Sequence, residues 1–493
     1  MFVKKPNIVL VMADDMGYWS MGCAGNREIR TPNLDKLAEE GILFPNCFCA
    51  SPVCSPARAS ILCGKMPSQH GVHDWLCRGY VNYDEEVSPE LKAQHQNPGA
   101  SWEYDWSRQQ LAGDRAVRYL DGFRAYTDIL AENGYACGLS GKWHLGDSGH
   151  AQKGFSYWKT IAMGGDNYYY PVVLQDGQFS MLRGTYITDY ITENALGFLE
   201  EQTDGRPFYL SVHYTAPHAP WDERHHPAEF YHLYDGCAFT ETPNVPPHKW
   251  GGSYTPEQRK QWLQGYYAAV SAMDAGIGKI MRELKNRGLW EDTIFLFTAD
   301  NGMSMGHHGI FGKGNGTFPM NLYDTAVKVP LIISYPRTIR GGSVAQGLYC
   351  HYDIMPTIAG MMGETLGGGY PGRSFQELFE GKIPAGRESI VVFDEYGPAR
   401  MIRTAEYKYI HRYPYGPHEF YHLKADPEEN ENLIDTKDPA LQSVIAQMKN
   451  QMEQWFLQYT DPDKDGTKQA VCGLGQLSPV GGKSMGRQAF IQN

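Results

Sequence analysis

The 493-residue sequence lacks three features, and each absence excludes a class of protein. Its first apolar run, at residues 8–12, is too short for a membrane span or a signal-peptide core, and no later run is long enough. It contains no Cys-x-x-Cys pair, which argues against a structural zinc site and favours reduced thiols. Its formal net charge of −12 excludes the broad basic surface of a nucleic-acid-binding protein. We therefore expect a cytoplasmic protein with neither a membrane nor a nucleic-acid partner.

Most of the chain alternates strand-like apolar runs with helical patterns. The predicted strands are at residues 8–12, 135–139, 207–212, 293–298 and 329–335. The predicted helices are at residues 31–41, 121–133, 188–201 and 255–287. This alternation predicts an α/β fold over residues 1–375, in which helices sandwich a large mixed, mainly parallel sheet.

The last third of the chain has a different pattern. Short strand-like segments at residues 390–395, 399–403, 407–411 and 420–423 precede an amphipathic helix at residues 439–459. We expect a smaller C-terminal domain at residues 376–459, with an antiparallel sheet and one helix. Residues 460–493 are predicted to form an extended tail, because they have too little apolar surface to fold alone. We hypothesise that this tail lies across a neighbouring subunit of a homo-oligomer.

Four segments place polar residues directly after predicted strands, where open α/β sheets build their sites. These residues are Asp14 and Asp15, Lys142 and His144, His218, and Asp300 and Asn301. Each has an ordinary structural interpretation, such as a capping turn or a buried histidine, but their joint placement favours a common site. The three carboxylates and the amide among them suit a hard cation, Ca²⁺ or less favourably Mg²⁺.

Cys54 precedes a predicted helix that begins with Ser55 and Pro56 and runs to Cys63. Backbone N–H groups and the helix dipole at that end favour negative charge, so we expect an acidified thiol. Arg58 lies one turn into the helix, close enough to point back toward the thiol. The alternative interpretation is an ordinary capped helix with a buried cysteine.

The segment CSPAR at residues 54–58 resembles the C-x-P-x-R signature of the type I, formylglycine-dependent sulfatases of the alkaline-phosphatase-like superfamily. Other segments resemble further motifs of that family: ADD at residues 13–15, GKWHLG at 141–146, PHAP at 217–220, and TADNG at 298–302 with Lys313 in FGK. Their order and spacing fit the family from residue 6 to about residue 435. The resemblance therefore covers most of the chain.

This resemblance implies a modified residue and a metal. Cys54 would be oxidised to formylglycine by a formylglycine-generating or radical maturase enzyme, and the hydrated aldehyde would attack sulfur. The implied Ca²⁺ ligands are Asp14, Asp15, residue 54, Asp300 and Asn301.

The resemblance also implies roles for five other side chains. Arg58 would orient the nucleophile, and Lys142 and Lys313 would hold sulfate oxygens. His144 would be the base that releases sulfate, and His218 the acid that protonates the leaving alcohol. Such a local cluster of cations would allow a protein with a negative net charge to bind an anionic substrate.

Two long insertions, at residues 73–106 and 214–262, are rich in aromatic residues. Aromatic rings pack against the C–H faces of sugars and against steroids or aryl groups, although packing of the loops themselves is the ordinary explanation. The weaker candidates for substrate contacts are His73, Trp75, Asp166, Asn167, His308 and Arg400.

The leading functional hypothesis is hydrolysis of a sulfate ester on a small sulfated substrate, a mono- or oligosaccharide derived from a glycosaminoglycan or mucin. The alternative enzymatic functions are those of an aryl or steroid sulfatase, or of a phosphodiester or phosphonate monoester hydrolase of the same superfamily. A third class is a sulfoglycan-binding protein in which Cys54 is never matured. A set that includes a leaving-group acid argues against a pure binding protein, because binding needs no such acid.

Overall fold

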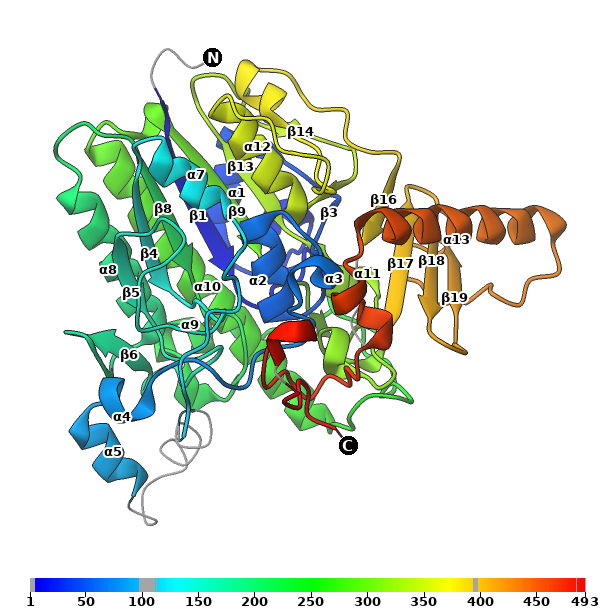
Figure 1. Ribbon diagram of the computed structural model, residues 1–493, viewed down its shortest axis with the longest axis horizontal. Helices are drawn as coiled ribbons and strands as arrows, with labels where there is room; N and C mark the ends of the chain where they lie inside the picture. Colours follow the sequence, from blue (N-terminus) through cyan, green and yellow to red (C-terminus); the bar gives the residue numbers. More distant parts are fainter. Residues whose placement is uncertain (1–4, 97–110, 112, 393–397, 485, 493) are drawn as a thin grey trace.

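The computed structural model describes residues 5–96, 111, 113–392, 398–484 and 486–492 of the chain. Figure 1 shows a large sheet with helices on both faces and a smaller sheet beside it. The strands of the large sheet are, in spatial order, β14 (Ser343–Val344), β2 (Ile42–Leu43), β13 (Leu331–Ser334), β9 (Thr293–Ala299), β1 (Asn7–Ala13), β8 (Phe208–His213), β4 (Ala136–Gly141) and β5 (Tyr157–Thr160). The predicted α/β fold is confirmed.

The large sheet is mixed but mainly parallel. β1 lies between β8 and β9 and is parallel to both, and β4 continues the parallel run on the other side of β8. β13 is antiparallel to its neighbours β9 and β2. All seven residues of β1 are buried, as expected for a parallel strand that is covered on both faces.

Two groups of helices cover the sheet (Figure 1). On one face α10 (Pro256–Asn286) contacts both α1 (Pro32–Glu40) and α8 (Ile187–Glu201). On the other face α2 (Cys54–Cys63), α7 (Tyr126–Glu132) and α12 (Ile354–Met361) contact one another. α7 begins later than the predicted helix at residues 121–133, because the Asp128 carboxylate accepts the Ala125 N–H and caps the helix there.

Shorter elements complete the part of the chain before residue 380. The short strands are β3 (Cys47–Phe48), β6 (Val172–Gln175), β7 (Gln178–Met181), β10 (Ser304–Met305), β11 (Phe311–Gly312), β12 (Lys328–Val329) and β15 (Tyr349–Cys350). The short α-helices are α3 (Pro67–His70), α4 (Tyr83–Glu86), α5 (Pro89–His95), α9 (Ala228–Tyr231) and α11 (Asp324–Val327). In the described part of the chain, no helix has the length and apolar character needed to cross a bilayer.

The C-terminal sheet is antiparallel, as predicted. Its strands are β16 (Ser389–Val392), β17 (Ala399–Thr404), β18 (Tyr407–Arg412) and β19 (Glu419–His422), and α13 (Pro439–Tyr459) packs on β17 and β18. A buried ionic network joins this sheet to α11. The Lys408 ammonium lies 3.0 Å from Asp324 and 2.6 Å from Glu429, and Arg403 lies 2.9 Å from Asp324.

The last residues of the chain pack on the part of the same chain that contains the large sheet. In Figure 1 the segment after α13 runs back toward α2 and α3. Its apolar side chains Val471, Val480 and Phe490 are buried in a small cluster with Val53 and Met320. This cluster provides the apolar contacts that composition alone did not indicate, and it brings the tail next to the residue that precedes Cys54.

Candidate active site

The candidate active site forms where four strands end at one edge of the large sheet. The parallel register places Ala13 beside Ala299 and Gly141 beside His213. The residues that follow these strand ends continue the pairing: the N–H of Asp300 donates to the Ala13 carbonyl at 3.0 Å. The polar residues predicted at the strand ends are therefore brought together by the sheet itself.

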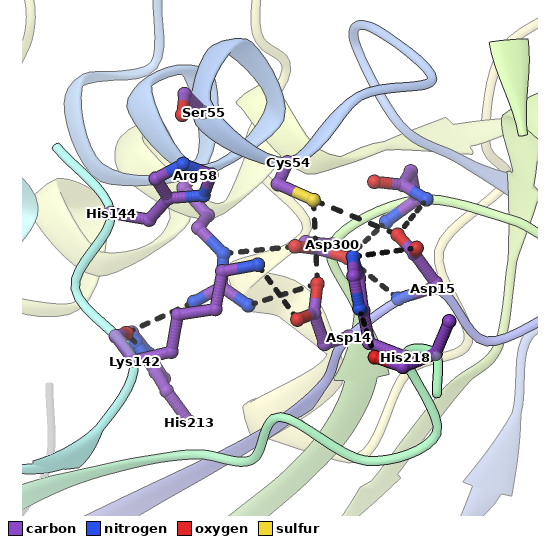
Figure 2. Close-up of polar contacts among 12 residues, drawn as sticks. Asp14, Asp15, Cys54, Ser55, Arg58, Lys142, His144, His213, His218 and Asp300 are labelled. Atoms are coloured by element: carbon purple, nitrogen blue, oxygen red, sulfur yellow. Dashed lines mark hydrogen bonds and ion pairs between the residues drawn. The ribbon is translucent and has the colours of Figure 1, made fainter. Parts of the chain in front are cut away.

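Three buried cations pair with three buried carboxylates at this edge, and Figure 2 shows two of the cations, Arg58 and Lys142, beside the carboxylates. The pairs are Lys142 Nζ to Asp14 Oδ2 at 2.7 Å, Lys313 Nζ to Asp15 Oδ1 at 2.6 Å, and Arg58 Nε to Asp300 Oδ2 at 2.8 Å. Because buried charges are stable only when they are compensated, removing any one member leaves a partner with an unbalanced charge.

The carboxylates differ in their protonation behaviour. Burial raises the pKa of Asp14, even though Lys142 opposes the shift. Burial also opposes ionisation of Asp15 and Asp300, yet Lys313 lowers the pKa of Asp15 and Arg58 lowers that of Asp300. Asp14 is thus the carboxylate that needs further positive charge in order to remain ionised.

Cys54 is the first residue of α2, and its thiol faces the carboxylates (Figure 2). Its Sγ lies 3.4 Å from Asp14 Oδ1, 3.6 Å from Asp15 Oδ1 and 2.8 Å from Lys313 Nζ. The expectation of an acidified thiol is wrong, because burial and the nearby Asp14 raise the pKa of Cys54. The helix begins at Cys54 with Val53 as its cap, rather than at the predicted Ser55. The unmodified thiol is therefore a poor source of thiolate.

Two histidines flank the cluster. His218 Nε2 lies 3.5 Å from Asp15 Oδ2, and its Nδ1 lies 2.8 Å from the Ala219 carbonyl. His144 Nε2 lies 3.2 Å from the Leu76 carbonyl, and burial, reinforced by Lys142, lowers the His144 pKa. His144 is thus held as a neutral imidazole.

The backbone is tightly constrained around these histidines. Asp15 (φ 60°) and His144 (φ 57°) adopt the left-handed conformation that non-glycine residues rarely take. A Cβ atom on Gly164 would overlap the His144 ring, and one on Gly165 would contact His218 at 3.4 Å. The glycine pair therefore lines both imidazoles, and Gly164 permits the close approach of the chain to His144.

Two of the weaker candidates for substrate contacts follow this glycine pair. The Asp166 carboxylate accepts the N–H groups of Asn167 and Val172, and burial raises its pKa to about 8. The Asn167 side-chain oxygen accepts the Tyr169 N–H. Both side chains are buried and stabilise the turn that carries the glycines.

The other four weaker candidates have partners elsewhere in the fold. His73 lies against Phe490 of the tail, and the Trp75 indole donates to the Gly473 carbonyl at 3.2 Å. His308 stacks on Tyr323 with ring centroids 3.7 Å apart. Arg400 pairs with Asp465 at 2.9 Å. Their contacts with substrate stay predictions, as do those of residues 97–106 in the aromatic insertion, which lie outside the described residues.

Two residues at this site, His213 and Leu76, were not predicted from the sequence. His213 is the last residue of β8, and its Nδ1 lies 3.0 Å from the Lys142 carbonyl. The strand-end rule that selected Lys142 and His218 would also have selected His213. Leu76 contributes only backbone atoms, and a backbone contact leaves no signal in a sequence.

Comparisons with known protein families agree with this geometry. The family model "Sulfatase" matches residues 6–99 and 118–364 of the chain. A second model, "N-sulphoglucosamine sulphohydrolase, C-terminal", matches residues 306–458. The first model alone covers more than half of the chain and includes every residue of the cluster described above.

Individual relatives point the same way. The chain is 27% identical to the N-acetylglucosamine-6-O-sulfatase of Bacteroides thetaiotaomicron, over 94% of this chain and 88% of the relative. It is 30% identical to an ulvan-active sulfatase of Formosa agariphila, over 87% and 77% of the two chains. A protein solved with its substrate D-glucosamine-2-N,6-O-disulfate has a TM-score of 0.73 at 25% identity, covering 94% of this chain and all of that one. The chain therefore belongs to the sulfatase family of sulfuric ester hydrolases.

Proposed function

We propose that the protein hydrolyses a sulfate ester on a small sulfated sugar and that Cys54 is the precursor of its nucleophile. One observation carries this proposal: the Cys54 side chain is buried between two carboxylates and within 2.8 Å of a lysine. A buried, neutral cysteine does not need the two carboxylates or the lysine for its stability. The arrangement is instead suited to a modified residue that reacts with an anion beside a cation.

The residues present fit a hard divalent cation. Asp14, Asp15 and Asp300 offer carboxylate oxygens within 4.8 Å of one another, and all three are buried. The Asn301 side-chain oxygen is buried and has no hydrogen-bond partner among the described residues, so its lone pairs are available. Oxygen donors of this kind favour Ca²⁺, with Mg²⁺ as the alternative. We infer that these four residues, with residue 54, would hold the ion.

Formylglycine and Ca²⁺ would have one role in the reaction, and the cationic side chains of the protein would have another. When present, formylglycine supplies an oxygen nucleophile and Ca²⁺ supplies Lewis acidity at the same place. A bound cation would also compete for the carboxylates that now pair with Lys142 and Lys313. The two ammonium groups would then be available to hold sulfate oxygens, and Arg58 would remain on Asp300.

The two histidines are suited to opposite proton transfers. The Nδ1 of His218 faces the Ala219 carbonyl, which can only accept, so this nitrogen carries a proton and Nε2 faces the cluster. We assign His218 Nε2 the proton that goes to the leaving alcohol. His144 is neutral and buried, so it is suited to accept a proton near residue 54.

Sugar substrates are supported by what similar proteins act on. Both curated relatives named above are described as acting on sulfated carbohydrates, an N-acetylglucosamine sulfate and ulvan. The phosphonate monoester hydrolase of Agrobacterium radiobacter has a TM-score of 0.67 at 20% identity, which shows the shared fold alone. We therefore place a sulfated mono- or oligosaccharide first and treat aryl sulfates and phosphonates as outcomes of the test.

The proposal is tested on protein co-expressed with a formylglycine-generating or radical maturase enzyme. Sulfate release is measured from N-acetylglucosamine-6-sulfate, sulfated disaccharides and 4-nitrophenyl sulfate, and release of the alcohol is measured from a phosphonate monoester, with Cys54→Ala as the control. We expect sulfate release from at least one sugar and none from the variant. Hydrolysis of the phosphonate monoester without sulfate release from any substrate would overturn the proposal, as would equal activity in the Cys54→Ala protein.

A further inference from the structure

The tail of the chain reaches the active site through one loop. Residues 71–77 lie between α3 and the catalytic cluster, and Gln476 of the tail forms a parallel bridge with Leu76 in this loop. Gln476 is fully buried at 0% exposure, although it lies in a segment rich in glycine and polar residues. A buried polar side chain in such a segment indicates a specific set of hydrogen bonds.

Gln476 holds the loop through both its side chain and its backbone. The Gln476 Oε1 atom accepts the His73 N–H at 2.9 Å, and the Nε2 atom donates to the Gly71 carbonyl at 3.0 Å. The Gln476 N–H donates to the Trp75 carbonyl at 2.7 Å, and its carbonyl accepts the Cys77 N–H at 2.9 Å. The loop backbone is therefore fixed on both sides of Leu76.

Leu76 connects this loop to Ser55 and to His144 of the catalytic cluster. Its N–H donates to the hydroxyl oxygen of Ser55, the residue after Cys54, at 3.1 Å. Its carbonyl lies 3.2 Å from Nε2 of His144. Ser55 and Leu76 are both fully buried, so solvent does not replace either bond.

The Leu76 carbonyl also determines which nitrogen of His144 carries the proton. A carbonyl can only accept, so Nε2 must be the protonated nitrogen of the neutral ring. The Nδ1 atom of His144 is then left with a free lone pair, and it has no hydrogen-bond partner among the described residues. Loss of the Leu76 contact would leave the ring free to take either tautomer.

We propose that Gln476 is a positioning residue, which fixes the Leu76 carbonyl and through it the orientation and tautomer of His144. The catalytic consequence rests on the proposed function, in which His144 accepts a proton, because only the unprotonated Nδ1 of this tautomer can accept it. The structural claim does not, because it concerns only the ring of His144 in the folded chain. The C-terminal tail thus supports the site through Gly71 and His73, which lie more than 400 positions earlier in the sequence.

The structural claim is tested by NMR of unmatured protein with isotope-labelled histidine, using Gln476→Ala. The His144 signals are identified by their loss in His144→Gln. We expect the Nε2–H tautomer in the parent and a mixture of tautomers in Gln476→Ala. If that variant fails to fold, Gln476→Met replaces it, because methionine fills the same space without the side-chain hydrogen bonds to Gly71 and His73. Unchanged His144 signals in a folded variant would overturn the proposal.

The matched control is Ser478→Ala, which removes the hydrogen bond from the Ser478 hydroxyl to the Gln488 carbonyl and leaves the loop contacts intact. In matured protein we expect Gln476→Ala to lower kcat by about tenfold or more, with KM within about threefold, because a base displaced by a fraction of an ångström loses most of its effect. Ser478→Ala is expected to stay within about twofold of the parent. An unchanged kcat in a variant with altered His144 signals would overturn the catalytic role. If the parent releases no sulfate, the proposed function fails, while the NMR result still decides the positioning claim.

Discussion

The Nζ atom of Lys142 lies 2.7 Å from Oδ2 of Asp14, although 128 positions separate the two residues in sequence. Each is the first residue after a strand, β4 for Lys142 and β1 for Asp14. Parallel strands end at a common edge, so the sheet brings both residues to one place. In this structure the Lys142 ammonium thus pairs with Asp14, a carboxylate that we expect to bind the metal ion.

Ca²⁺ is expected to stabilise the folded protein, because an ion that binds only the folded state raises the free energy of unfolding. The gain is about 2.7 kcal/mol when the ion is at one hundred times its Kd. Thermal unfolding with Ca²⁺ and with a chelator measures it. Asp300→Asn removes a ligand and should abolish the shift, whereas the exposed Asp235→Asn should keep it. A Ca²⁺ shift of equal size in Asp300→Asn would contradict the assignment.

Gly164→Ala is expected to lower kcat by at least about tenfold, because the added Cβ overlaps the His144 ring and displaces it. Gly252→Ala is the matched control, since no atom lies within 4 Å of a Cβ built there. Steady-state kinetics and thermal unfolding of both variants separate a local displacement from loss of the fold. Full activity in Gly164→Ala would show that catalysis does not depend on the present position of the His144 ring.

Lys408→Met is expected to reduce the free energy of unfolding by about 3 kcal/mol, because it leaves the buried carboxylate of Glu429 without its cation. The exposed pair of Lys382 and Glu380 provides the comparison, and Lys382→Ala should cost much less, because solvent screens an exposed ion pair. Urea unfolding of the two variants measures both values. Equal costs would show that burial of the network contributes nothing.

The stability of the protein is expected to fall as the pH falls from about 6.5 to 4. Burial lowers the pKa of His73 to about 4, whereas an unfolded histidine titrates near 6.5. Between these values the unfolded chain binds a proton that the folded chain does not, so acid favours unfolding. The contribution of His73 is at most about 3 kcal/mol at pH 4.

His73→Gln is therefore expected to lose less stability than the parent between pH 7 and pH 4. Urea unfolding at several pH values measures the difference, with the partly exposed His232→Gln as the control. Identical pH dependence in the parent and His73→Gln would contradict the assigned burial.

The fold and the charged cluster could be predicted from the sequence, because both follow from local sequence patterns. A buried strand such as β1 is a continuous apolar run, and the residues after it occupy the site edge. The raised pKa of Cys54 could not be predicted, because the sequence indicates where the helix begins but not the burial that opposes the effect of the helix dipole. The role of Gln476 could not be predicted either, because it depends on side-chain and backbone contacts with a loop about 400 residues earlier in the sequence.

Mass spectrometry of the peptide that contains residue 54 tests the central claim most directly. The peptide is taken from protein of the native host or from co-expression with a maturase, and sulfate release is measured on the same sample. We expect an aldehyde or its hydrate in place of the Cys54 thiol, in a fraction that rises in proportion to sulfate release. A fully unmodified thiol in a sample that releases sulfate would contradict the account.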